Sequence, residues 1–182
     1  METFQTRPHI LLGGEKKAGK STLIRRLLGI CACPVYGFIT KKDPPGANGL
    51  CGIYMYPASV PEEKRKRTEE NRIGFSSGAG YEICKDVFAS LGVALIEQAE
   101  PGGLLVMDEL GFMEAEVPAF TDAVLRALQA DIPVLAAVKQ RYDVAFLNTV
   151  RNTERARLYT VNADTRDVLF ETLSGEYPFC RK

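Results

Sequence analysis

The sequence carries no excess of charge of either sign, because its 23 lysines and arginines balance its 23 aspartates and glutamates. Balanced charge argues against a protein that holds nucleic acid by bulk electrostatics, and an apolar content of 46% argues against disorder. Long apolar runs are missing too. Residues 134–138 form one of the longest, far short of the ~18 residues that span a bilayer. We therefore expect a globular protein with neither a membrane span nor a nucleic-acid partner.

The cysteines and the single histidine give little support to a disulfide framework or a zinc centre. A secreted framework uses an even number of cysteines and needs an export signal, but residues 1–7 show no apolar stretch after a basic start. Cys31 and Cys33 could share a metal, yet His9 is the only histidine and no second ligand pair stands at a suitable spacing. We expect free thiols in a reducing, cytoplasmic setting. The five cysteines are Cys31, Cys33, Cys51, Cys84 and Cys180.

Short apolar runs alternate with helical patterns along the chain, which predicts an α/β protein with a three-layer sandwich and a mostly parallel sheet. The length fits one domain over residues 1–182. Two aromatic and β-branched runs predict an inserted β-hairpin, followed by a charged loop or short exposed helix, so that hairpin and loop together cover about 35–74. The strands are expected at 9–12, 35–41, 50–56, 104–107, 134–138 and 158–161, and the helices at 20–28, 80–98, 117–130, 143–152 and 164–173.

The strongest chemical signal is the segment Gly14-Glu-Lys-Lys-Ala-Gly19-Lys20-Ser21, which matches G-x-x-x-x-G-K-[ST] in full between an expected strand and an expected helix. Its glycines let backbone N–H groups converge on phosphate oxygens, and the helix N-terminus adds its positive dipole end. We expect Lys20 to bind the β- and γ-phosphates as a catalytic cation and the Ser21 hydroxyl to hold Mg²⁺. The expected nucleotide-binding residues of this P-loop are Gly14, Glu15, Lys16, Lys17, Ala18, Gly19, Lys20, Ser21 and Thr22.

A second signal is the apolar run at 104–107 that ends in Asp108 and Glu109, a Walker B arrangement. We expect this run to be a buried strand next to the P-loop strand, with its carboxyl end at the edge of the sheet where ligands collect. Asp108 would then orient Mg²⁺ through the waters that this ion retains. Glu109 would act as a catalytic base toward an attacking water.

The segment Asp108-Glu-Leu-Gly-Phe-Met-Glu114 resembles the D-E-I-G-K-M-E signature of a small family of P-loop nucleoside-triphosphatases, which occurs in archaea, bacteria and animals. The stretch Tyr36-Gly-Phe-Ile-Thr40 is similar to the family's G-F-x-T strand, and Val150-Arg-Asn152 is similar to a late I-R-N element. The resemblance covers nearly the whole chain. It implies Mg²⁺-dependent hydrolysis of nucleoside triphosphates to diphosphates, with broad base tolerance and slow turnover.

Two positions depart from the family pattern. Phe112 stands where the family has a lysine, and the tip of the P-loop is Glu15-Lys16-Lys17 rather than rich in proline and glycine. Both departures bear on the rate of hydrolysis rather than on nucleotide binding. Lys16 offers one way to replace the missing charge, and a solvent-facing Lys16 is the plainer alternative.

Two further side chains are candidates for the same region. Arg141 follows the strand at 134–138 and so lies at the carboxyl edge, where it could contact the nucleotide or point to solvent. Glu114 could hydrogen-bond within the loop after Glu109 or face water.

Other classes of P-loop protein stay open alongside the triphosphatase. A small-molecule or nucleotide kinase shares the P-loop and the sheet but adds a lid with several arginines, and the basic cluster at 64–67 has no matching pair of lid helices. A nucleotide-gated binding or assembly module would use hydrolysis as a timer. The sequence does not show which nucleotide base is preferred, and Asn148 does not begin an N-K-x-D motif that would recognise guanine. ATP, GTP or another triphosphate therefore remains possible, and no protein partner is indicated.

Overall fold

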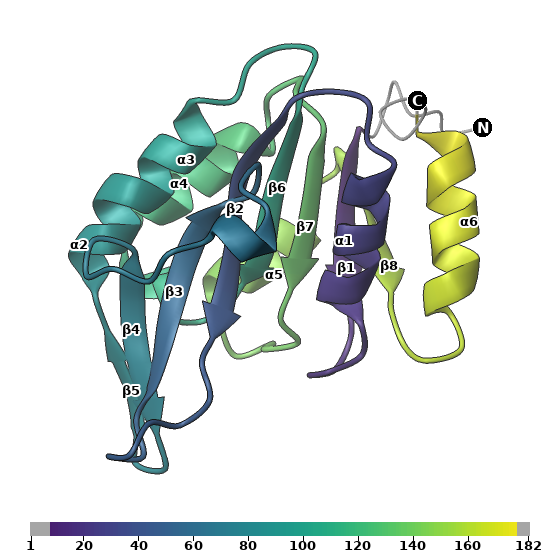
Figure 1. Cartoon of the computed structure of the whole chain (residues 1–182). Coiled ribbons are helices and arrows are strands. Elements are labelled where there is room, and N and C mark those ends of the chain that lie inside the picture. The colour runs from purple at the N-terminus through teal and green to yellow at the C-terminus, as the bar shows by residue number, and fades with distance from the viewer. Residues whose placement is uncertain (1–7, 178–182) are drawn as a thin grey trace.

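In a computed structural model that describes residues 8–177, the chain forms one eight-stranded sheet between two layers of helices (Figure 1). The strand order is β5-β4-β3-β2-β6-β7-β1-β8. The strands are β1 (His9–Gly13), β2 (Val35–Lys42), β3 (Cys51–Pro57), β4 (Arg72–Ser77), β5 (Gly80–Ile83), β6 (Leu104–Leu110), β7 (Val134–Val138) and β8 (Ala156–Thr160). The helices are α1 (Lys20–Gly29), α2 (Lys85–Val87), α3 (Val93–Glu97), α4 (Pro118–Ala127), α5 (Ala145–Arg151) and α6 (Arg166–Glu176).

Five neighbouring strands, β2, β6, β7, β1 and β8, run parallel, which confirms the expected α/β fold. Successive side chains of a strand point to opposite faces of the sheet, and both faces are apolar here. Ile10 and Leu12 of β1 join the core under α1 and α6, whereas Leu11 joins the core under α3, α4 and α5. Helices thus cover both faces, as a parallel sheet requires.

The expected hairpin exists but is part of a larger antiparallel extension. The strands β2 and β3 pair antiparallel as predicted, and β4 and β5 continue the sheet outward. The prediction of a helix at 80–98 was wrong for its first residues, because Gly80–Ile83 is strand β5 and pairs with β4. Ile83 packs on the core from the strand, so its apolar character fitted either structure. The helical stretch begins at Lys85.

The charge run behaves as predicted, because Glu62–Lys64 forms a short exposed 3₁₀ turn. Figure 1 shows the antiparallel extension reaching below the carboxyl ends of the parallel strands. It therefore flanks the edge at which the P-loop lies.

The expected order of the two motif strands was also wrong. β7 lies between β1 and β6, so the strand that carries Asp108 is not the direct neighbour of the P-loop strand. Sequence order does not reveal this, because β7 follows β6 in the chain and enters the sheet between two strands that precede it. The carboxyl ends of all three strands still meet at one edge, since the three are parallel.

No helix within residues 8–177 is long and apolar enough to cross a membrane. Cys31, Cys33, Cys51 and Cys84 are free thiols. The expectations for residues 1–7 and for Cys180 fall outside the described part of the chain.

The buried His9 makes stability depend on pH. Its Nδ1 accepts a hydrogen bond from the Val134 N–H at 3.2 Å, and burial, with the nearby Arg155, lowers its pKa from 6.5 to about 4. The unfolded chain therefore binds a proton between these values that the folded chain does not, so the free energy of unfolding falls as pH drops through this window.

We expect His9→Asn, whose amide oxygen can accept the same bond, to flatten this pH dependence by up to about 3 kcal/mol between pH 7 and pH 4. Asp108, whose pKa burial raises to about 6, acts in the opposite direction but is common to both proteins. Urea denaturation at a series of pH values measures the difference. Parallel curves for the two proteins would contradict the assignment.

Candidate active site

The candidate site is a cavity of about 670 Å³ at the carboxyl edge of the parallel strands. One end is polar and formed by the P-loop and by the end of β6. The other end is apolar and reaches under the antiparallel extension. The lining residues are Gly14, Glu15, Lys16, Lys20, Ser21, Thr40, Lys42, Ile53, Ile73, Tyr81, Phe88, Asp108, Glu109, Gly111, Phe112, Met113, Glu114, Lys139, Gln140 and Arg141.

The P-loop turns sharply at two glycines. Gly14 has φ 143°, and a Cβ there would lie 2.4 Å from the Val161 carbonyl oxygen, so only glycine fits. Gly19 precedes α1 in the left-handed region with φ 100°, and no side chain caps the helix. The first N–H groups of α1 are therefore open to an anion, whose charge the helix dipole favours.

Lys20 folds back over the loop from the first position of α1. Its Nζ donates to the carbonyl oxygens of Gly14 at 2.9 Å and Glu15 at 3.0 Å, and only 5% of the residue is exposed. The same ammonium lies 3.7 Å from Glu109 Oε2. The lysine thus holds its charge inside the loop, where a phosphate group can replace these neighbours.

Ser21, in the first turn of α1, and Asp108, near the end of β6, are in contact at the carboxyl edge of the sheet. The Ser21 hydroxyl donates to Asp108 Oδ1 at 2.9 Å, and Asp108 is 3% exposed. Burial raises the pKa of Asp108 to about 6, while the hydrogen bond from Ser21 opposes that shift. A nearby cation would favour the ionised carboxylate.

This pair fits Mg²⁺. The ion prefers oxygen ligands, takes few from the protein and retains several waters, and a hydroxyl beside a buried carboxylate provides such a donor set. Within residues 8–177 no cluster of three or more His, Cys, Asp or Glu side chains is present. Ser21 and Asp108 would therefore hold the ion together with the nucleotide and water.

Glu109 faces the same cavity as its neighbour Asp108. In a regular strand consecutive side chains point to opposite faces, but the pairing of β6 with β7 is irregular between Met107 and Leu110. Both carboxylates consequently line the cavity. The Glu109 N–H donates to Thr40 Oγ1 at 3.2 Å, which ties this bend to β2.

Lys139 is a site residue that the sequence analysis missed. It follows β7, and its Nζ lies 3.5 Å from Glu109 Oε1 and 5.4 Å from the centre of the Phe112 ring. The signal for it was available, because Lys139 ends the same apolar run that placed Arg141 at the carboxyl edge.

Arg141 lines the cavity as expected, but its guanidinium is engaged by Asp143 through bonds of 2.9 and 2.6 Å. This bidentate pair lowers the pKa of Asp143 to about 2. Of the P-loop residues, Gly14, Glu15, Lys16, Lys20 and Ser21 line the cavity. Lys17, Ala18, Gly19 and Thr22 form the turn and the start of the helix beside them.

The Glu114 side chain stabilises the loop after β6. It is 4% exposed, and its Oε1 accepts a hydrogen bond from the Gly111 N–H. Burial raises the pKa of Glu114, an effect that this hydrogen bond opposes. The side chain thereby fixes the backbone of residues 111–114, which carries Phe112 toward the cavity.

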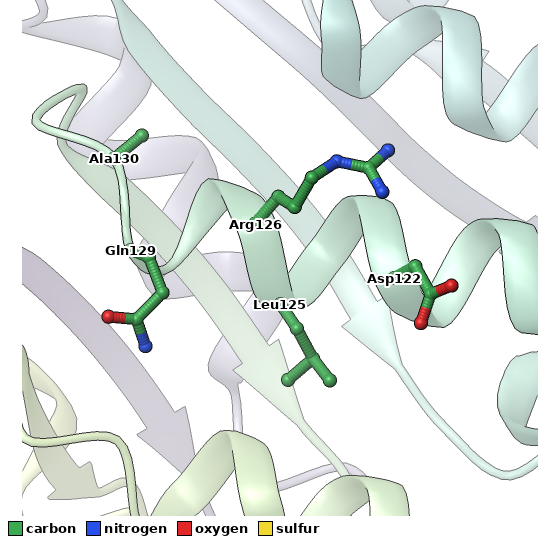
Figure 2. Close-up of a pocket in the computed structure, with 5 residues that line it drawn as sticks. All are labelled: Asp122, Leu125, Arg126, Gln129 and Ala130. Carbon is green, nitrogen blue, oxygen red and sulfur yellow. The ribbon is translucent and has the colours of Figure 1, made fainter.

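A second depression lies on the outer surface at α4 and is lined by Asp122, Leu125, Arg126, Gln129 and Ala130 (Figure 2). Its Arg126 is paired with Glu97 at 2.7 Å. These residues come from one helix and the turn after it, away from the P-loop, so the cavity at the strand ends is the candidate active site.

Comparison with known proteins gives matches over nearly the full length. The nucleoside-triphosphatase THEP1 of Natranaerobius thermophilus is 27% identical over 93% of this chain and 96% of its own. The protein of that name from Methanocaldococcus jannaschii is 25% identical over 90% of this chain and 94% of its own.

Solved structures share the fold. THEP1 from the hyperthermophile Aquifex aeolicus superimposes with a TM-score of 0.72 at 21% identity, covering 93% of this chain and 99% of the other. A human cancer-related nucleoside triphosphatase gives a TM-score of 0.65 at 18% identity, covering 96% of this chain and 99% of the other.

A family model described as NTPase matches residues 9–174. Because that match includes both the P-loop and the segment from Asp108 to Glu114, together with most of the chain, this protein belongs to the NTPase family.

Proposed function

We propose that the chain is a cytoplasmic, Mg²⁺-dependent nucleoside-triphosphatase that converts nucleoside triphosphates to diphosphates and phosphate, with residues 1–182 acting as one domain. The observation that carries the proposal is the convergence of Lys20, Ser21, Asp108 and Glu109 on one cavity. The names of the relatives support the reaction, and the free thiols of the described residues suit a reducing compartment.

Each residue has a defined part in this reaction. The open N–H groups of α1 and the Lys20 ammonium bind the β- and γ-phosphates. Ser21 and Asp108 hold Mg²⁺, which supplies positive charge to the phosphate oxygens when it is bound. Glu109 accepts a proton as the oxygen of a water bonds to the γ-phosphorus. The bond from that phosphorus to the bridging oxygen breaks, and the diphosphate leaves with the electron pair.

We infer broad base tolerance, so that ATP, GTP and other triphosphates are substrates. The resemblance to the family implies this breadth, and Asn148, Thr149, Val150 and Arg151 do not form a guanine-reading motif. Arg141 is proposed to contact the nucleotide after exchanging its bond to Asp143 for a phosphate oxygen, because both ligands suit a guanidinium.

One observation favours a second function, transfer of the γ-phosphoryl group to an organic hydroxyl. The apolar end of the cavity is lined by Ile53, Ile73, Phe88 and Met113. These side chains could bind the apolar part of an organic acceptor, whereas hydrolysis by water does not require them. Diphosphate formation with water as the sole acceptor supports the triphosphatase. Stimulation by an added hydroxyl compound supports a kinase, and stimulation by a protein supports a nucleotide-gated module.

The direct test is phosphate release from ATP, GTP, CTP and UTP, with and without Mg²⁺. We expect Mg²⁺-dependent release by the purified protein.

We expect Lys20→Ala to bind triphosphate about 10- to 100-fold more weakly in calorimetry, because a charge-assisted bond to phosphate contributes roughly 1.5–3 kcal/mol. Lys85→Ala, which removes a surface lysine paired with Glu116, is the control. Unchanged affinity in Lys20→Ala would contradict the P-loop assignment.

Glu109→Gln separates binding from chemistry. The amide keeps the shape of the side chain but cannot take up the proton, so we expect turnover to fall by about 10²–10⁴-fold. Triphosphate affinity should stay within a few-fold of the wild-type value. Steady-state phosphate release and calorimetry measure the two quantities. Turnover within a few-fold of wild type, with binding intact, would show that Glu109 has a structural role only.

A further inference from the structure

We propose that Lys139 is a positioning residue that orients the Glu109 carboxylate and supplies, from the loop after β7, a positive charge beside Phe112. The inference deepens the proposed function and rests on it. Lys139 lies at the carboxyl end of the strand between β1 and β6, and it lines the cavity with Glu109 and Phe112.

The two oxygens of Glu109 each face a different lysine. Lys20 Nζ lies 3.7 Å from Oε2, and Lys139 Nζ lies 3.5 Å from Oε1. The two contacts are not equivalent once a nucleotide binds, because the phosphates compete for the P-loop lysine. Lys139 then remains as the cation that holds Glu109 beside the γ-phosphate.

Phe112 provides a surface for this cation instead of a charge of its own. The Lys139 ammonium lies 5.4 Å from the centre of the Phe112 ring, within the range of a cation–π interaction. Tyr81 packs edge-on against the same ring, with 4.9 Å between ring centres. A lysine at position 112 would place a like charge near Lys139, so the aromatic residue and the cation from the β7 loop suit each other.

The backbone around Lys139 is fixed from two sides. Its N–H donates to the Leu110 carbonyl oxygen at 2.9 Å, which joins the loop to the end of β6. The Arg151 guanidinium donates to the carbonyl oxygens of Lys139 and Arg141. The lack of a side chain at Gly111 leaves room, because a Cβ there would lie 3.2 Å from both Cδ and Nζ of Lys139.

Of the other cations that line the cavity, Lys16 and Arg141 are less suited to this role. Lys16 lines the cavity from the exposed tip of the P-loop, and its suggested part as the replacement charge stays an untested prediction. Arg141 also lies over Phe112, 5.1 Å from the ring centre, but its carboxylate partner is Asp143 rather than Glu109, and its proposed contact is with the nucleotide. Lys139 is the one of these three that contacts Glu109 in an ion pair among the described residues.

The test uses the full chain and compares Lys139→Met with Lys139→Arg. We expect Lys139→Met to lower kcat by about 10- to 100-fold, because a displaced catalytic group loses activity of this order, with KM within threefold of wild type. Lys139→Arg should recover most of the loss. Lys85→Met, which breaks a Lys–Glu pair on the surface, should behave as wild type. Circular dichroism and urea denaturation check that each variant is folded.

Two double variants test the mechanism. In the Glu109→Gln background, Lys139→Met should lower kcat by less than a further threefold, because the lysine acts through Glu109. Adding Phe112→Lys to Lys139→Met should recover part of kcat. A full independent loss in the Glu109→Gln background, or wild-type kcat in Lys139→Met, would overturn the inference. Absence of triphosphate hydrolysis by the wild-type protein would instead overturn the proposed function.

Discussion

A hydrogen bond from Ser21 to Asp108 joins the first turn of α1 to the end of β6, and the rest of the site is arranged around that contact. The two residues stand 87 positions apart in the chain, and β7 lies between the strands that lead to them. For the hydroxyl to reach the carboxylate, β1, β7 and β6 must be parallel and end together. The same condition brings Lys20, Glu109 and Lys139 into one cavity.

The site lies where two kinds of sheet meet. The parallel strands supply the phosphate cradle and the acids. The strand β2, which pairs parallel with β6 and antiparallel with β3, supplies Thr40, which holds the backbone of Glu109. The antiparallel extension supplies Tyr81, which packs on Phe112. The cavity therefore has a charged end that suits phosphate and an apolar end under the extension. The charged end accounts for nucleotide binding in the proposed function. The apolar end is the reason to test whether an organic hydroxyl compound, rather than water, accepts the phosphoryl group.

The sequence was sufficient to predict the glycine-rich loop, the strand and helix beside it, and the position of Asp108 at the same edge of the sheet as Ser21. These features follow from local rules, because G-x-x-x-x-G-K-[ST] specifies its own backbone and the ends of parallel strands share an edge. The order of strands was not predictable in this way. The residues of a strand do not show whether it enters the sheet between two others, so β6 was wrongly expected next to β1.

Two other features depend on tertiary contacts. Gly80–Ile83 became a strand because β4 offers an edge for it to pair with, although its apolar residue also fitted a helix. The irregular pairing of β6 with β7 turns both Asp108 and Glu109 toward the cavity, and no spacing in the sequence reveals that. The sequence could place Lys139 at the carboxyl edge, as it placed Arg141, but the contact of Lys139 with Glu109 depends on the folded chain.

The central claim is that Ser21 and Asp108 form a Mg²⁺ site at the end of the P-loop. Calorimetry with a non-hydrolysable ATP analogue, with and without Mg²⁺, tests it most directly. The account predicts that Mg²⁺ increases the affinity of the wild-type protein for the analogue. Asp108→Asn should lose most of this increase and recover part of it at high Mg²⁺. The control Ser90→Ala, which changes an exposed serine bonded within its own helical stretch, should keep the full increase. The same gain from Mg²⁺ in wild type and in Asp108→Asn would contradict the claim.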